Sequence, residues 1–177
     1  RRVGEFVGAR WLAARANTRR KRQRLLNQFR SHGLVPASLR GLHSWLALDP
    51  QLADAVIDAD PMGVIEYGDA DALNPDQVRH LLLTLEKLFI DNPRLIGWQE
   101  YHAAALVAPP LMNDVARIVG DQGAEFRLRL LLLQQLKNMP TAEGQRTLLR
   151  ERIFDESELY AIRHESAQVL IKLGGEN

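Results

Sequence analysis

The stretch VRHLLLTLEKLF, residues 78–89, decides the fold class of this chain. Its large apolar residues recur at intervals of three and four, which places them in one stripe along an α-helix: Val78, Leu81, Leu82, Leu85, Leu88 and Phe89. Asn74 and Pro75 come just before it, an acceptor suited to the N-cap and a proline suited to the first helical position. The stretch therefore predicts a capped amphipathic helix.

The same helix signals recur along the chain. Further Asx-Pro pairs mark where we expect one element to end and another to begin: Asp49-Pro50, Asp60-Pro61 and Asn92-Pro93. A stripe lies between Pro109-Pro110 and Gly120, and residues 125–139 carry leucines around most of the circumference, as in a central helix. A last helix is predicted from Asp155, with Glu158 in an acidic version of the capping box, to just before Gly174-Gly175.

Evidence for strands is nearly absent, since no run alternates with period two and no Asn-Gly or Asp-Gly turn occurs. We predict an all-α fold without a sheet, of roughly eight to eleven helices, mostly of 10–18 residues and antiparallel to their neighbours. The leucine-rich segments 79–87, 129–137 and 163–173 resemble one another at unequal offsets. This irregular repeat favours a HEAT-like α-solenoid over a symmetric bundle.

Composition limits the class of protein. The 177 residues are 46% apolar and 25% charged, as in a folded globular protein, and contain no cysteine, which excludes disulfides and thiolate metal sites. There is no signal-peptide core and no apolar run of the ~20 residues that span a bilayer, so we expect a cytoplasmic protein without membrane contact. Because the first residue is Arg rather than Met, we expect the chain to be processed, trimmed or excised from a longer protein.

Charge is strongly segregated. Residues 1–40 hold eleven Lys or Arg against one acid, whereas residues 41–177 carry an excess of nine acids. A basic face is expected on the helix around TRRKRQR: Arg15, Arg19, Arg20, Lys21, Arg22 and Arg24. Such a face can contact the phosphates of a nucleic acid, remain solvated, or pair with acids of an adjoining domain. Aromatic residues for base stacking are missing from the run.

Catalytic motifs are not found. No GxxxxGK[ST] loop and no GxSxG elbow occurs, and no two histidines lie three to five residues apart. His43, between Leu42 and Trp45, is interpreted as a core or boundary residue. We therefore predict no enzymatic activity, no catalytic residue, no cofactor and no metal for this chain.

Residues 58–69, DADPMGVIEYGD, overlap the calcium-loop pattern of an EF-hand, with Asp58, Asp60 and Gly63 at the expected positions. Met62 supplies no oxygen ligand, and Asp69 stands where a longer Glu normally binds the ion. The favoured interpretation is that Asp60 caps a short helix beginning at Pro61, which Gly68 ends. A second local feature is the aromatic group in WQEYH, which indicates either packing under a loop or a partner-binding patch: Trp98, Tyr101 and His102.

Two stretches resemble a known family. EFVGARWLAARA resembles the segment that closes the winged-helix part of bacterial NACHT-like signal-transduction NTPases of the STAND class. VPASLRGLHSWLAL and DPMGVIEYGDADAL resemble the helical region that follows in one group of them, in which a "DP…YGD" segment corresponds to Asp60, Pro61, Tyr67, Gly68 and Asp69. The resemblance covers residues 4–90, and beyond them only a HEAT-like pattern continues, clearest in YAIRHESAQVLIKLG. Gly8 replaces the usual alanine.

The resemblance implies an organisation and a role. Residues 1–33 would be a basic helical junction at the end of an upstream module, and residues 34–177 a HEAT-like repeat region. The implied role is a non-catalytic scaffold or sensor in defence or regulation, partnered by the upstream NTPase domain of the same polypeptide and by a protein ligand. The family's phosphate loop and magnesium site would lie before Arg1. The expected domain-junction residues are Glu5, Phe6, Arg10 and Trp11, and part of the apolar face of this first helix should be exposed. A stand-alone nucleic-acid-binding module is the alternative.

Overall fold

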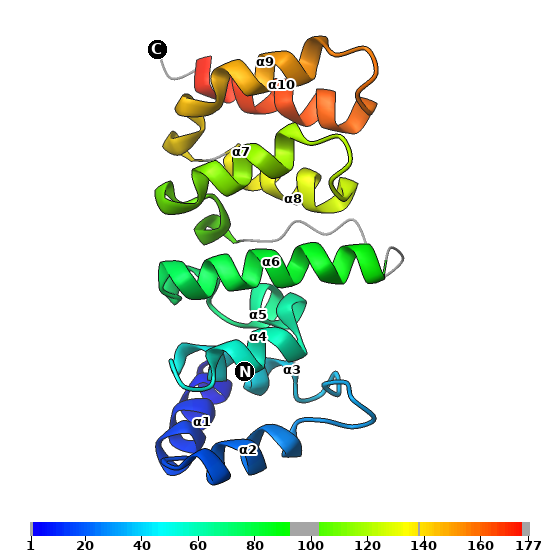
Figure 1. Cartoon of the computed structure of the whole chain (residues 1–177). Coiled ribbons are helices and arrows are strands. Elements are labelled where there is room, and N and C mark those ends of the chain that lie inside the picture. The colour runs from blue at the N-terminus through cyan, green and yellow to red at the C-terminus, as the bar shows by residue number, and fades with distance from the viewer. Residues whose placement is uncertain (1, 93–102, 138, 175–177) are drawn as a thin grey trace. The chain divides into compact units, whose positions relative to one another are not determined.

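The computed structural model describes residues 2–92, 103–137 and 139–174. Within these ranges the chain forms ten α-helices and five 3₁₀ helices, and the only β-type pairing is an isolated bridge between Ser31 and Leu34. The predicted all-helical class is confirmed (Figure 1). Contacts divide the chain into two compact units, residues 1–85 and 86–177.

The first unit holds α1 (Arg2–Arg15), α2 (Arg19–Gln28), α3 (Arg40–Trp45), η1 (Leu46–Leu48), α4 (Ala53–Ala59), α5 (Pro61–Tyr67), η2 (Ala70–Ala72) and most of α6 (Pro75–Asp91). α1 packs on α3, and a Cβ on Gly8 would lie 3.2 Å from Leu42 Cδ1. Glycine therefore brings the two helices close together, at a cost of about 1 kcal/mol in helix propensity relative to alanine. The division at residues 33/34 into a junction and a repeat region stays a prediction.

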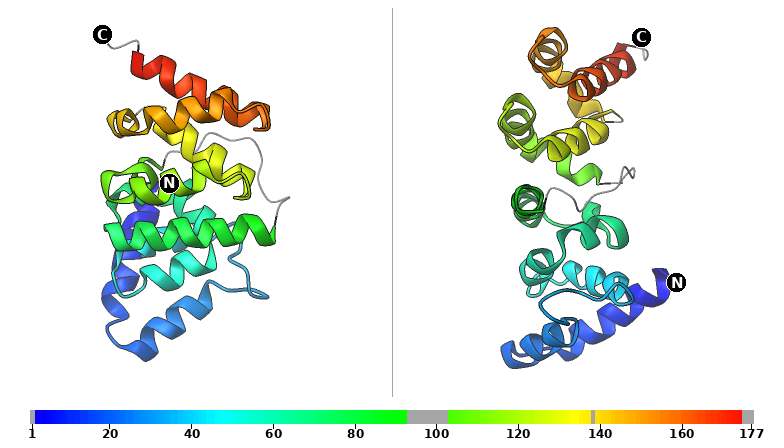
Figure 2. Two further views of the ribbon diagram at one scale, coloured as in Figure 1. Left: turned by 45° about the horizontal axis from the view of Figure 1, so that its top comes forward. Right: turned by 90° about the vertical axis from the view of Figure 1, so that its right-hand side faces the viewer.

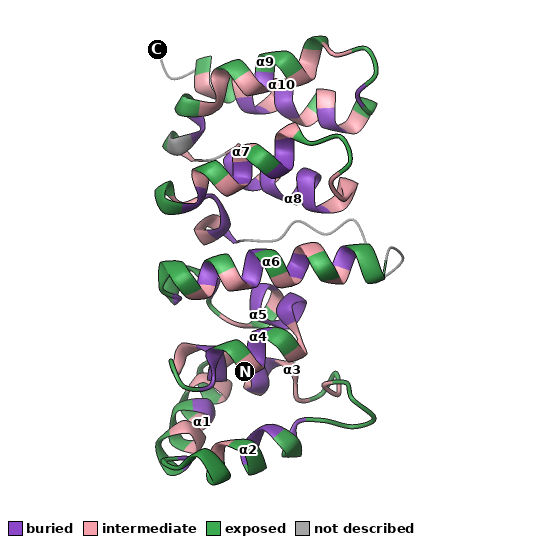
Figure 3. Cartoon of the chain, in the orientation of Figure 1, coloured by how far each residue is buried: buried purple, intermediate pink, exposed green. Residues whose placement is uncertain are grey.

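A predicted cap is present at the start of α6. Asn74 Oδ1 accepts from the Gln77 N–H at 3.0 Å, and Gln77 Oε1 accepts from the Asn74 N–H at 3.0 Å, which is a reciprocal capping box at the start of α6. The stripe on α6 is buried at Val78, Leu81, Leu82, Leu85 and Phe89, while Leu88 is half-buried. Figure 3 shows the resulting alternation of buried and exposed residues along α6.

The second unit contains the described helices η3 (Ala104–Val107), η4 (Pro109–Leu111), α7 (Met112–Gly120), α8 (Phe126–Leu136), η5 (Pro140–Gln145), α9 (Arg146–Phe154) and α10 (Tyr160–Gly174). α7 with α8, and α9 with α10, form antiparallel hairpins (Figure 2). α8 is the central helix that its leucines predicted, because eight of its eleven residues are buried. The buried residues are Leu128, Arg129, Leu130, Leu131, Leu132, Leu133, Gln135 and Leu136.

These two hairpins repeat with an offset of 34 residues. Asp121 and Asp155 end α7 and α9 in nearly the same extended backbone conformation, with φ and ψ of −84° and 113° in one and −75° and 106° in the other. Arg129 Nε donates to the Val119 carbonyl at 3.2 Å, and Arg163 Nε donates to the Ile153 carbonyl at 3.0 Å. The resemblance between segments 129–137 and 163–173 therefore reflects equivalent positions in two structural repeats.

Three expectations need correction. The last helix begins at Tyr160 rather than Asp155, because Asp155 ends α9 and its side chain accepts the Ser157 N–H in the connecting turn. The helix after Asp49-Pro50 begins only at Ala53, since Asp49 Oδ1 accepts the Gln51 N–H in a turn. α3, α4 and α5 have six or seven residues and α7 and α9 nine, shorter than expected, because turns interrupt the chain at close intervals.

Candidate interaction surface on α1 and α2

α1 carries an exposed apolar stripe, here called the α1 ridge: Val3, Val7 and Trp11. Their exposed fractions are 76%, 57% and 56%, whereas Ala9 on the face toward α3 is 1% exposed. Spacing of four residues puts the three side chains one above another along the helix. The expectation that part of the apolar face of this helix is exposed is confirmed.

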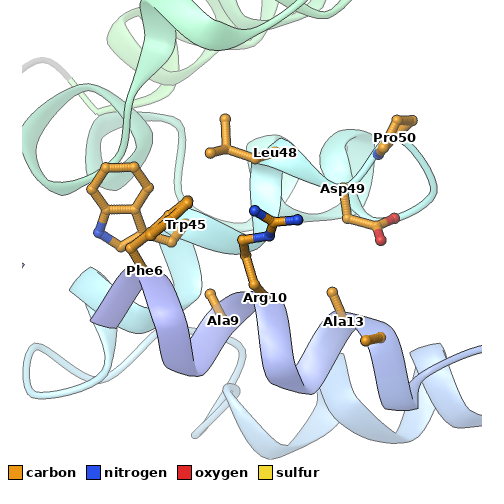
Figure 4. A pocket seen from close by; sticks show the side chains of 9 residues that line it. Phe6, Ala9, Arg10, Ala13, Trp45, Leu48, Asp49 and Pro50 are labelled. Carbon is orange, nitrogen blue, oxygen red and sulfur yellow. The ribbon is translucent and has the colours of Figure 1, made fainter. Parts of the chain in front are cut away.

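Beside the ridge lies an open hollow of about 410 Å³, the α1 hollow. Phe6, Ala9, Arg10, Ala13 and Ala14 of α1 form one wall. The other wall comes from Trp45 of α3, Leu48 of η1, and the turn residues Asp49 and Pro50. The small alanines leave room between the walls, and in Figure 4 the Arg10 side chain projects from α1 toward Leu48 and Asp49.

The hollow combines aromatic surface with one cation. Phe6 packs edge-on against Trp45, with ring centroids 5.2 Å apart, and the Arg10 guanidinium carbon lies 5.8 Å from the Phe6 centroid. Arg10 is exposed and forms no ion pair with any residue that the structure describes. The Trp45 indole N–H is buried without a hydrogen-bond acceptor among the same residues. The hollow therefore offers a guanidinium that is free to bind a carboxylate or phosphate.

The predicted basic face is on the surface. Arg15, Arg19, Arg20, Lys21 and Arg24 are exposed, and Arg22 is half-buried. Their contacts are local: Lys21 Nζ donates to Asn17 Oδ1 at 3.0 Å, Arg22 donates to the Ala16 carbonyl at 3.4 Å, and Arg15 stacks on Trp11 with its guanidinium carbon 3.5 Å from the ring centroid. In the described ranges none of the six pairs with an acid. Acids in the described part of this chain therefore do not neutralise the positive charge of the basic face.

Arg40 organises the centre of the first unit. Its guanidinium binds both oxygens of Asp60, at 2.7 and 2.9 Å, and Glu66 Oε2 at 2.8 Å, and lies 5.1 Å from the Tyr67 ring centroid. The hydrogen bonds that Arg40 donates to Asp60 raise the pKa of Arg40 against the opposing effect of burial. Asp60 Oδ1 also accepts the Gly63 N–H at 2.9 Å, so it caps α5.

This arrangement decides between the two interpretations of residues 58–69. Asp60 is the N-cap, Pro61 the first residue of α5 and Gly68 its C-cap, as the capping interpretation predicted. Asp58 instead receives His80 Nε2 at 2.8 Å, from α6. Within the described ranges, no cluster of three His, Asp or Glu side chains is placed to hold a metal ion.

The second unit contains a buried ion pair that the sequence did not predict. Arg129 and Glu158 are each 1% exposed in their side chains and bind through both guanidinium NH groups and both carboxylate oxygens. Arg152 lies 3.4 Å from the same carboxylate, and the Leu159 N–H donates to it at 2.9 Å. Burial opposes ionisation of Glu158, but the hydrogen bonds from Arg129 and Leu159 outweigh it and lower the pKa.

His43 is a buried core residue, as predicted. It is 1% exposed and packs against Phe29 with ring centroids 5.4 Å apart. Burial, opposed by the charge of Asp60 and assisted by those of Arg30 and Arg40, lowers its pKa to about 4. The imidazole is therefore neutral at pH 7 and serves the packing of α3.

The other predicted site residues divide into two groups. Glu5 is half-buried and faces α3, where a Cβ on Gly41 would lie 2.5 Å from its Oε2. The proposed patch of Trp98, Tyr101 and His102 lies outside the described residues. Sequence reasoning missed the contributions of Trp45, Leu48 and Pro50 to the hollow, because no sequence spacing relates these positions to α1.

Comparisons with known proteins add no assignment. No family model, no curated protein and no solved structure matches this chain. Of the helices that the structure describes, none has both the length and the apolar content that crossing a bilayer requires. The exposed surface of α1 and α2 is therefore the feature of this chain that bears on its function.

Proposed function

We propose that this chain is a non-catalytic helical interaction module, in which α1 is the surface that contacts a partner. The observation that carries the proposal is that the α1 ridge and the α1 hollow lie on adjacent strips of one helix, and that Arg15 of the basic face stacks on Trp11 of the ridge. A ridge with three large apolar side chains more than half exposed, rimmed by charge, is the arrangement of a protein-binding site.

We extend the proposal to the context that the sequence resemblance implies. In it, the chain is the cytoplasmic HEAT-like helical region that follows the winged-helix end of a bacterial NACHT-like, STAND-class NTPase. α1 contacts the upstream NTPase domain of the same polypeptide, and the helical hairpins hold that switch or sense a protein ligand. The repeat at an offset of 34 residues supports a solenoid, since stacked hairpins extend by adding equivalent units.

The first experiment reads the coding sequence upstream of Arg1 and assays ATP hydrolysis. We expect a phosphate-binding loop upstream, hydrolysis by the full polypeptide and none by residues 1–177. In the full polypeptide, Val7→Glu places a charge on the ridge and should alter basal hydrolysis, because the contact that restrains the switch is weakened. Ile171→Glu, at another exposed apolar position in the second unit, is the matched control. Hydrolysis by residues 1–177 alone, or equal effects of both variants, would refute the proposal.

Nucleic-acid binding is the second candidate, favoured by the six basic residues that pair with no acid in the described ranges. Its affinity should fall steeply with salt and be lost when Arg19, Arg20 and Arg24 are changed to Glu. One structural feature opposes it. Arg15 covers one face of Trp11, so the exposed aromatic nearest the basic face has only one face left for a base.

A further inference from the structure

We propose that the α1 hollow and its basic surroundings bind an acidic amphipathic helix belonging to the partner domain that α1 contacts. This inference rests on the proposed role of α1 as an interaction surface and specifies the chemistry of what binds there. It assigns an apolar anchor of the partner to the hollow and a carboxylate of the partner to Arg10.

The hollow is sized and lined for an apolar anchor. At about 410 Å³ it falls in the range of pockets that enclose small ligands, ~300–1,000 Å³, and so accommodates a large side chain. Phe6, Trp45, Leu48 and Pro50 provide apolar contacts, and the alanines at 9, 13 and 14 provide depth. An aromatic or branched aliphatic side chain entering here would displace water from these surfaces, which is the main favourable contribution at an interface core.

Charge specifies what should flank that anchor. Arg10 stands in the hollow without an ion pair among the described residues, and its planar guanidinium can bind a carboxylate through two N–H groups. The acid in the hollow is Asp49, which is half-buried and already accepts the Gln51 N–H. Beyond the C-terminal end of α1, the basic face continues the positive field. A partner segment with Glu or Asp beside its apolar residues is complementary to this distribution.

Helical spacing favours a helix as the bound form. The ridge residues recur every four positions along α1, and the hollow residues Phe6, Arg10 and Ala13 lie on the adjacent strip of the same helix. A helix lying along α1 presents its own residues at intervals of three and four to both strips. Nucleic acid would satisfy the cations but offers no apolar side chain for the hollow, so the acidic helix is favoured.

The test uses a defined probe. An 18-residue fluorescein-labelled peptide carries Leu and Trp at positions i, i+4, i+7 and i+11, with Glu at most remaining positions. Fluorescence anisotropy measures its Kd at ~50 mM and ~300 mM salt. The comparison probes are a peptide of identical composition with the apolar residues out of helical register and an 18-nucleotide single-stranded DNA. We expect micromolar binding of the amphipathic peptide, at least tenfold tighter than the shuffled one.

Two variants test the site, and two further variants are controls. Arg10→Glu reverses the charge in the hollow, and Ala14→Trp fills the hollow from an exposed position, so both should weaken binding of the amphipathic peptide at least tenfold. Arg150→Glu makes the same charge reversal at an exposed position of α9 and should leave Kd unchanged. Circular dichroism verifies the helical content of each variant. Arg10→Lys keeps the charge in the hollow and should retain most of the affinity, and it is the variant to compare with wild type if either of the other substitutions disturbs folding.

Three results with the peptides overturn the inference: no binding at ~1 mM peptide, equal binding of the shuffled peptide, or an unchanged Kd in Arg10→Glu. Tighter binding of the DNA, competing with the peptide, would also overturn it and favour the nucleic-acid candidate. These failures are distinguishable from failure of the proposed function. If the peptide does not bind but Val7→Glu still changes hydrolysis in the full polypeptide, the hollow has another role and α1 remains an interaction surface.

Discussion

The buried pair of Arg129 and Glu158 gives the sharpest prediction about stability. Arg129→Leu removes two hydrogen bonds to Glu158 and two to the Val119 carbonyl, all inside the second unit. Glu158 is then left as a buried carboxylate with only Arg152, at 3.4 Å, as a charged partner. Breaking a buried pair in this way costs about 3–5 kcal/mol, which is a large part of the ~5–15 kcal/mol that stabilises a typical domain.

Urea unfolding followed by far-UV circular dichroism measures this loss, and hydrogen exchange of α8 and α10 amides assigns it to the second unit. The double variant Arg129→Leu with Glu158→Leu should recover part of the lost stability, because Glu158 is no longer left as a buried, uncompensated carboxylate. It should stay about 1–3 kcal/mol below the wild type, since the Val119 carbonyl still lacks its donor. Arg150→Leu, at an exposed position of α9, is the control and should change stability by less than ~0.5 kcal/mol.

The same pair makes stability depend on pH. The pKa of Glu158 is lowered from its ordinary value of 4.5, so its contribution is fully present above pH 4.5 and is lost as the pH falls through the folded-state pKa. Glu158→Gln should be less stable at pH 7 and should lose less stability on acidification than the wild type. A loss below ~1 kcal/mol in Arg129→Leu, or parallel acid profiles of wild type and Glu158→Gln, would refute the reasoning.

Three further predictions concern other parts of the fold. Asp60→Ala removes the α5 cap and the carboxylate that pairs with Arg40, and should lower the free energy of unfolding in urea by about 2 kcal/mol. Asp69→Ala, at an exposed position, is the control and should be nearly neutral. Equal effects of the two variants would contradict the assigned role of Asp60. The pKa of His43 is lowered from 6.5 to about 4, so between these pH values the unfolded chain takes up a proton that the folded chain does not. The free energy of unfolding should therefore fall on the order of 3 kcal/mol from pH 6.5 to pH 4. In His43→Leu this part of the decline should disappear, and an unchanged pH profile would refute the prediction. Arg163→Ala should lower the free energy of unfolding by about 1 kcal/mol, less than Arg129→Ala. Arg163 makes the equivalent contact with a backbone carbonyl, but from a half-buried position and without a buried acid as partner. A larger loss of stability in Arg163→Ala than in Arg129→Ala would contradict this ranking.

Local signals predicted those parts of the structure that depend on residues close in sequence. The cap of Asn74 and the start of α5 at Asp60-Pro61 were predictable because the interacting groups are three residues apart. The same reasoning placed the start of the last helix wrongly. Asp155 followed by Glu158 matches a cap, but both side chains have other partners, Ser157 and Gln122 for Asp155 and Arg129 for Glu158. A local pattern does not reveal competition from a distant side chain.

The sequence by itself determined the helical class, the capped starts of α5 and α6 and the exposed basic segment, because periodicity, caps and charge density are properties of short windows. Only the tertiary structure decided which residues form the candidate site. The α1 hollow joins Phe6 and Arg10 to Trp45, Leu48 and Pro50, and Arg129 meets Glu158 across 29 residues. Such pairs form because packing two helices brings together side chains whose separation along the chain carries no periodic signal, and burial then fixes their energies.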